Sequence, residues 1–376
     1  MKLFDVYPLY NVTPVSAKGI VVTDDKGQEY LDFYGGHAVI SIGHSHPHYV
    51  NRLTEQLNKI GFYSNAVQNP IQEALAERLG KQSGCENYNL FMCNSGAEAN
   101  ENALKMASFI TSKSRVIAFK NSFHGRTSAA VAATDNATIN APINQQQKVT
   151  FLELDDIEGF EKEISKGDVC GVILEAIQGV GGLDEPTTPV YQKIASLCKE
   201  YKVILIADEV QSGFGRSGKF FGFQHHNIEP DIISIAKGMG NGFPVGGILL
   251  HESIEAKYGL LGTTFGGNHL ACVATLAVLE VIEKENLIAN AKNLGAYFTE
   301  KAKEIPQVKR VKGRGLMLGL EFDFDVAELR KKLIYDHHLF TGGAKDKKVL
   351  RILPALNIST ADLDVLFNAL KKALNE

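Results

Sequence analysis

Short apolar segments that alternate with amphipathic segments are the feature that most constrains the fold of this sequence. From about residue 89, runs typical of buried strands are separated by stretches with helical periodicity. Parallel strands need a long crossover connection, usually a helix, so this alternation indicates βαβ units. The sequence therefore predicts an α/β fold, with a mostly parallel central sheet and helices on both faces. The predicted strands are 89–93, 115–120, 148–154, 169–176, 203–208, 231–237 and 245–251, and the predicted helices are 98–110 and 188–202.

The pattern changes at both ends of the chain. Residues 19–36 have the alternation and turn residues of a hairpin. After about residue 268, a long helical stretch (269–303) precedes a glycine-containing hairpin or bent strand (308–322), which predicts a smaller α+β unit. A helix (326–338), a strand (349–356) and a last helix (360–375) complete that unit. The expected domains are an N-terminal segment packing with the small domain (1–45), a large α/β domain (46–275) and a small C-terminal α+β domain (276–376).

Composition excludes several classes of function. The 376 residues carry a net charge of -4 with scattered lysines and arginines, whereas a nucleic-acid footprint needs a basic patch. No segment has the apolar length of a membrane span, and the first residues have no signal-peptide pattern. The five cysteines form no CxxC pair and are expected to be reduced and buried. We therefore expect a cytoplasmic protein that binds neither nucleic acid nor membrane.

Two further patterns resemble binding motifs but lack the necessary context. Gly213, Gly215 and Gly218 spell GxGxxG, yet no helix opens there, as a dinucleotide site requires. Phe220 stands where a phosphate loop needs Ser or Thr. A glycine-rich surface loop is favoured, and a nucleotide-binding protein is kept as the alternative from a different class. The histidines at 44, 46 and 48 alternate, but with no nearby acid or cysteine set we predict no metal site.

Ionisable residues at the ends of two predicted strands point to chemistry. Asp208 ends the apolar run 203–208, and Lys237 ends the run 231–237. An acid there is costly to bury unpaired, and a partly desolvated lysine amine can form a Schiff base. Arg351 lies inside another apolar run, where an arginine is rarely buried without an anion.

The predicted helix at 98–110 begins with a capping box, Ser95 followed by Glu98. Gly96 and Ala97 would let a phosphate approach the free N–H groups of its first turn. Phe123 could stack on a flat ring, and Arg126 could grip a carboxylate. One ligand accounts for all these features together: pyridoxal 5'-phosphate, which requires a Schiff-base lysine and an acidic partner for its ring nitrogen.

Eight motifs, in order along nearly the whole chain, resemble those of the class III (subgroup II) aminotransferases of fold type I, and most closely those of the acetylornithine aminotransferases. They are YLDFYGGHAV with GHSHP, NSGAEANENALK, FHGR, IQGVGG, DEVQSGFGRSG, SIAKGMGNGFP, GTTFGGNHLA and VLRILPALN.

This resemblance implies a role for each candidate residue. Lys237 would hold the cofactor and transfer protons, and Asp208 would pair with the ring nitrogen. The substrates implied are an N-acylornithine and 2-oxoglutarate, which yields glutamate. Gln211 would contact the ring hydroxyl, and Val210 and Phe123 would lie on the ring faces. The cofactor phosphate would be bound by Ser95, Gly96 and Ala97, and by Thr264 of the neighbouring subunit in a homodimer. The residues implied at the substrates are Arg126, Arg351, Tyr10 and Glu175.

The sequence also departs from the family pattern. Val180 stands where relatives have a glutamate thought to mask the residue matching Arg351, and Ala176 replaces a proline beside Glu175. N-acetylornithine is the expected donor in a step of arginine biosynthesis. N-succinylornithine remains open, followed by ornithine δ- and 4-aminobutyrate aminotransferase activities.

Overall fold

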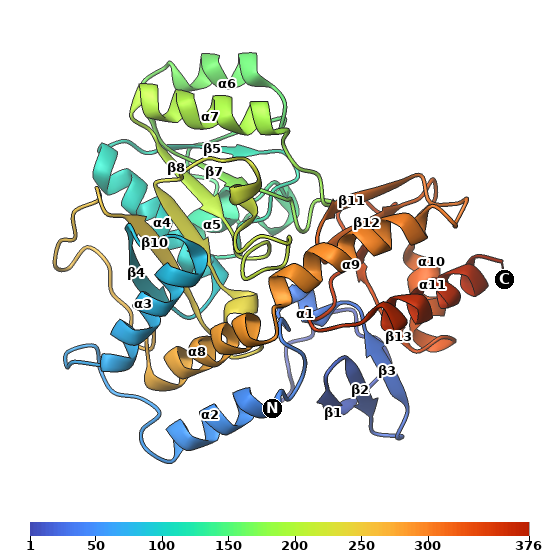
Figure 1. The fold of residues 1–376 in the computed structure, drawn as a ribbon. Helices are drawn as coiled ribbons and strands as arrows, with labels where there is room; N and C mark the ends of the chain where they lie inside the picture. The colour runs from blue at the N-terminus through green and yellow to red at the C-terminus, as the bar shows by residue number, and fades with distance from the viewer. Residues whose placement is uncertain (376) are drawn as a thin grey trace.

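A seven-stranded sheet forms the centre of the larger part of the molecule (Figure 1). The structure is a computed structural model that describes residues 1–375. The strand order is β4-β10-β9-β8-β7-β5-β6, and only β10 runs antiparallel to its neighbours. The α/β prediction with a mostly parallel sheet is confirmed. The strands are β4 (Tyr88–Cys93), β5 (Arg115–Phe119), β6 (Val149–Leu152), β7 (Val169–Glu175), β8 (Ile204–Asp208), β9 (Ile232–Ile235) and β10 (Gly246–His251).

Helices cover this sheet because its middle strands are apolar on both faces. Every residue of β5, β7, β8 and β9 is buried, as expected for parallel strands between two helical layers. Helix α4 packs across β7, β9 and β10, while α6 and α7 pack together on the other side (Figure 1). The helices here are α2 (Pro47–Leu57), α3 (Pro70–Ser83), α4 (Gly96–Thr111), α5 (Ser128–Ala132), α6 (Ile157–Ile164) and α7 (Thr188–Tyr201), with short 3₁₀ turns at Ala137–Ile139, Gly222–His225 and Lys237–Met239.

A second, antiparallel sheet of order β11-β12-β15-β14 forms the smaller part. The long helix expected over 269–303 is two helices, because Asn286 adopts a left-handed conformation (φ 57°) between them. Among residues 1–375, no helix combines the length and the apolar character needed to cross a membrane. The elements are α8 (His269–Lys284), α9 (Leu287–Ala302), β11 (Arg310–Arg314), β12 (Met317–Glu321), α10 (Ala327–Tyr335), β14 (Gly342–Gly343), β15 (Val349–Ile352) and α11 (Thr360–Asn375).

The N-terminal hairpin joins the C-terminal part of the chain through a third sheet, β1-β2-β3-β13. Strand β3 pairs in parallel with the two-residue strand β13, so chain segments about 300 residues apart lie side by side (Figure 1). A left-handed turn, α1 (Gly35–Ala38), follows β3 and precedes α2. The strands are β1 (Pro14–Lys18), β2 (Val21–Asp24), β3 (Glu29–Asp32) and β13 (Leu339–Phe340).

Candidate active site

A cavity of about 380 Å³ opens beyond the carboxyl ends of β8 and β9. Open α/β sheets bind ligands at this edge, because side chains that follow neighbouring strands converge there. Asp208 and Lys237 both line the cavity, as the two strand-end predictions require. It is also lined by Ser95, Gly96, Ala97, Phe123, Arg126, Glu175, Val180, Val210 and Gln211.

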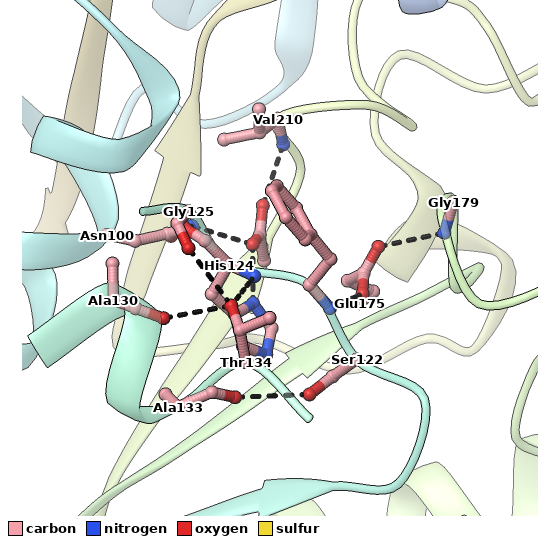
Figure 2. A network of polar contacts seen from close by, with 12 residues as sticks. Asn100, Ser122, His124, Gly125, Ala130, Ala133, Thr134, Glu175, Gly179 and Val210 are labelled. Carbon is pink, nitrogen blue, oxygen red and sulfur yellow. Dashed lines mark hydrogen bonds and ion pairs between the residues drawn. The ribbon is translucent and has the colours of Figure 1, made fainter. Parts of the chain in front are cut away.

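Asp208 is buried and accepts hydrogen bonds from three residues, Asn100, His124 and Val210, which Figure 2 labels. Its Oδ2 accepts hydrogen bonds from Asn100 Nδ2 and His124 Nδ1, each at 2.7 Å. Its Oδ1 accepts the N–H of Val210 at 3.1 Å. These three hydrogen bonds fix the orientation of the carboxyl group. Asp208 is therefore a positioned carboxyl group at the cavity wall.

Lys237 is separated from the end of β9 by Ala236 alone and has a left-handed backbone (φ 48°), which is costly for a residue with a side chain. Burial lowers the pKa of its amine, although the carboxylates of Asp208 and Glu175 act in the opposite direction. A lysine with a lowered pKa is a better nucleophile and base near neutral pH. Lys237 therefore combines a strained backbone with a buried amine at the cavity.

The first turn of α4 forms another wall of the cavity. Ser95 is the N-cap, and its hydroxyl accepts the N–H of Glu98 at 3.2 Å. A Cβ on Gly96 would lie 2.6 Å from Cγ1 of Val210, so only glycine allows the helix to approach so closely. The N–H groups of a helix's first turn have no partner within the helix and attract anions.

Glu175 lines the cavity, but both of its oxygens are occupied by the backbone. Oε1 accepts the N–H of Phe123 at 2.9 Å, and Oε2 accepts that of Gly179 at 2.8 Å (Figure 2). Burial raises the pKa of Glu175 to about 7, and the nearby charge of Asp208 adds to the effect, while His124 opposes it. Glu175 thus joins the Phe123 loop to the loop that contains Val180.

Arg351 is buried behind Gln211 and is not part of the cavity lining. Its Nη1 lies 3.5 Å from Oε1 of Gln211 and 2.7 Å from the carbonyl oxygen of Gly179, to which it donates. A Cβ on Gly179 would lie 2.3 Å from that Gln211 oxygen, so the close packing depends on glycine. Gln211 is therefore the side chain that links Arg351 to the cavity.

Of three further residues predicted for the site, one lines the cavity and two lie outside its lining. Arg126 lines the cavity and is exposed to solvent. Thr264 is exposed in the segment before α8 and is outside the cavity lining of this single chain. Tyr10 lies beside Tyr335 and under the guanidinium of Arg330, also outside the lining.

The glycine-rich loop is buried, so the expectation of a surface loop is wrong. Arg216 at its centre is 2% exposed and donates to the carbonyl oxygens of Leu316, Pro354 and Ile40. Burial lowers the pKa of Arg216 to about 9, with Asp32 opposing the shift. The glycines allow the backbone to pack closely, and the loop joins three distant segments.

The three alternating histidines do not converge. His44, His46 and His48 pair with different carboxylates, those of Asp32, Glu285 and Glu280 respectively. Within residues 1–375, no cluster of three or more His, Cys, Asp or Glu side chains could hold a metal ion.

Sequence reasoning gave no role to Asn100 and His124, the two side chains that hold Asp208. Both lie inside motifs that it singled out, but only the fold brings them to a residue more than 80 positions away. A signal was present, since an amide on a helix with an otherwise apolar buried face needs a partner. His124 Nε2 is buried and has no hydrogen-bond partner among the described residues.

The cavity suits pyridoxal 5'-phosphate. Its lining brings together an aromatic ring (Phe123), the start of α4, the amine of Lys237 and the carboxyl group of Asp208, which are the groups that this cofactor requires. A Cβ at position 96 would clash with Val210, so glycine is needed where the start of α4 meets this side chain.

Comparison with known proteins gives a consistent family. A profile described as Aminotransferase class-III matches residues 6–374. Acetylornithine aminotransferase from Bacillus subtilis is 37% identical, over 99% of this chain and 97% of that protein. The one from Aquifex aeolicus is 39% identical, over 99% of both. A Toxoplasma gondii ornithine aminotransferase structure, described with partial occupancy of PLP at its active site, aligns with a TM-score of 0.89 at 27% identity, over 97% of this chain and 90% of that one.

Proposed function

The chain belongs to the class-III aminotransferases, and from this premise we propose that it moves the terminal amino group of N-acetyl-L-ornithine to 2-oxoglutarate. The products are the semialdehyde of the donor and L-glutamate, in a step of arginine biosynthesis. The observation that carries the proposal is the meeting of Lys237, Asp208 and the start of α4 in one cavity. Relatives named for acetylornithine support the donor.

Pyridoxal 5'-phosphate is the proposed cofactor, and when bound it supplies a reactive aldehyde and an electron-withdrawing ring. Lys237 would hold it covalently. Ser95, Gly96 and Ala97 would bind its phosphate through the start of α4, where Ser95 is the N-cap. The other proposed contacts are Phe123 and Val210 on the ring faces and Gln211 at the ring hydroxyl, all of which line the cavity.

Two residues would handle protons. Asp208, oriented by Asn100 and His124, would hold a proton on the ring nitrogen. The amine of Lys237 would take a proton from the carbon that bears the substrate amine. It would return that proton to the aldehyde carbon of the cofactor. The lowered pKa of this amine suits that work near neutral pH.

Two arginines are proposed to bind carboxylates. Arg126, exposed at the cavity, would grip the α-carboxylate of the donor, far from the terminal amine that reacts. Arg351 would bind the α-carboxylate of 2-oxoglutarate or glutamate, beside the reacting carbon. Tyr10 and Glu175 are also proposed to lie near the bound substrate. The occupied oxygens of Glu175 favour an organising role for it.

A homodimer is part of the proposal. The segment that contains Thr264 is exposed, and aromatic side chains gather beside it, with Phe62 and Phe265 in ring contact at 5.5 Å. A second copy covering this surface would bring its Thr264 to the phosphate. A cytoplasmic location is also proposed, supported by five free, buried cysteines.

Half-reactions with single amine donors test the proposed substrate. Holoenzyme without 2-oxoglutarate is mixed with N-acetylornithine, N-succinylornithine, ornithine or 4-aminobutyrate, and loss of the cofactor's absorbance band is followed by stopped flow. N-acetylornithine should give the highest rate constant per unit concentration, followed by N-succinylornithine. A faster reaction with ornithine or 4-aminobutyrate would overturn the acyl-donor proposal while leaving the family assignment in place.

A further inference from the structure

Arg351 is a buried cation, and its hydrogen-bond partners within residues 1–375 are all neutral. Its Nε donates to the carbonyl oxygen of Gly343 at 2.6 Å, and its Nη1 donates to that of Gly179 at 2.7 Å. Its Nη2 donates to the hydroxyl of Tyr34 at 3.3 Å. Within residues 1–375, no carboxylate forms an ion pair with this guanidinium. Burial lowers the pKa of Arg351 and the charge of Arg330 lowers it further, while Tyr34 and the more distant carboxylate of Glu175 oppose the shift.

The hydroxyl of Tyr34 has a second partner, and this fixes the direction of both hydrogen bonds. Arginine can only donate, so the Tyr34 oxygen accepts from Arg351 and its proton points to Nδ1 of His37, 2.5 Å away. His37 must then be neutral at Nδ1. Burial lowers its pKa, and the charges of Arg351 and Lys237 lower it further. Burial also raises the pKa of Tyr34, so the phenol stays protonated.

The fold provides a defined place for the Tyr34 ring. Asp32 Oδ1 accepts the N–H groups of Tyr34 and Gly35, and the chain then enters the left-handed turn α1. His37 has a φ of 68° there, which is unfavourable for a residue with a side chain. Strained backbone conformations of this kind cluster at functional sites. A Cβ on Gly342 would lie 2.4 Å from Cε2 of Tyr34, so the ring packs directly on backbone.

We propose that Tyr34 is a specificity-determining residue: its hydroxyl is a neutral cover on Arg351 that the carboxylate of the amino acceptor displaces. This rests on the proposed role of Arg351 as a carboxylate site. A donor that reacts at its terminal amine places no carboxylate beside the reacting carbon, so Arg351 then needs another partner. Tyr34 supplies one, and breaking a hydrogen bond to a hydroxyl costs less than breaking a buried ion pair.

Glutarate, a five-carbon dicarboxylate without an amino or keto group, is the probe that tests this cover. The variant Tyr34→Phe keeps the ring, its contact with Gly342 and its place 5.7 Å from the guanidinium, but loses the competing hydroxyl. Calorimetry on the holoenzyme should show a glutarate dissociation constant roughly threefold to tenfold lower than in the wild type. Inhibition of the donor half-reaction by glutarate should strengthen by the same factor.

A control variant completes the experiment. Tyr297→Phe removes a hydroxyl that donates a hydrogen bond to Asp364, far from Arg351 in the sequence, and it should leave glutarate binding unchanged. Unchanged or weaker binding in Tyr34→Phe would overturn the proposal, since weaker binding would mean that the hydroxyl holds the carboxylate itself.

The variant Arg351→Ala separates this inference from the function on which it rests. If it abolishes glutarate binding while Tyr34→Phe has no effect, the arginine is a carboxylate site and only the cover is refuted. If Arg351→Ala binds glutarate as tightly as the wild type, the proposed role of Arg351 fails, and the inference about Tyr34 fails with it.

Discussion

Asp208 and Glu209 are neighbours in sequence, yet they do different work because the backbone turns their side chains in opposite directions. Asp208 faces the cavity and is held by donors from Asn100 and His124. Glu209 is fully buried away from it, where it accepts N–H groups of Gly222 and Phe223 and the hydroxyl of Ser212. Glu209, for which the sequence suggested no role, anchors the loop that carries Val210 and Gln211.

The carboxyl group of Glu209 titrates differently in the folded and the unfolded protein. Burial raises its pKa from 4.5 to about 7, so between these values the folded state binds more protons than the unfolded state. The contribution of Glu209 to stability is therefore fully present below pH 4.5 and is lost as the pH rises through 7. In Glu209→Gln this titration is absent.

The measurement is the free energy of unfolding of wild type minus that of Glu209→Gln, from urea titrations between pH 5 and pH 8. This difference should fall with rising pH, by up to about 3 kcal/mol. Glu175, whose pKa is also about 7, is present in both proteins, so its titration cancels. A difference that stays flat or rises with pH would show that Glu209 does not titrate as proposed.

Among the helices and strands, the features that could be predicted from the sequence are those that depend on local periodicity and on the residues at strand ends. Apolar runs identify the middle strands, and Asp208 and Lys237 meet because neighbouring strands end at the same edge of a sheet. The antiparallel direction of β10 leaves no trace in its own residues, since buried strands of either direction have the same composition. A single left-handed residue, Asn286, divides a helix whose apolar pattern continues across it.

Contacts between distant elements explain the rest of what the sequence did not predict. Tyr34 and Arg351 are 317 positions apart and meet only because β3 pairs with β13 and β14 pairs with β15. The glycine loop at 213–218 looks polar enough for the surface, but carbonyl oxygens from three segments accept the N–H groups of Arg216. Such partners are fixed by tertiary packing, which local patterns do not encode.

At the scale of the whole molecule, exposed aromatic side chains gather near Thr264. Tyr258 and Phe265 lie in the same segment, and Phe62, which contacts Phe265, is followed by Tyr63; all four are exposed. Exposed apolar patches of this kind mark interaction sites. The domain limits at residues 45 and 275 stay a prediction, although the sheet that joins β3 to β13 agrees with an N-terminal segment packed on the small domain.

A charge at this surface tests the proposed homodimer. Phe265 is 60% exposed in the single chain, and Phe265→Asp would bury a carboxylate in a dimer interface. Wild type should sediment with twice the chain mass of 41.1 kDa, whereas the variant should sediment as a monomer with little transamination. Val365→Asp, at a site that is 47% exposed on α11, should remain dimeric and active. A dimeric, active Phe265→Asp would place the interface elsewhere.

Lys237 is proposed to hold the cofactor in the cavity beside Asp208. Holoenzyme reduced with borohydride, digested and mapped by mass spectrometry measures this directly. The mass of the reduced cofactor should appear on the peptide that contains Lys237, and Lys237→Ala should fold normally yet show no label and at least about a thousandfold lower transamination. A label on any other lysine, or full activity in Lys237→Ala, would show that Lys237 does not hold the cofactor.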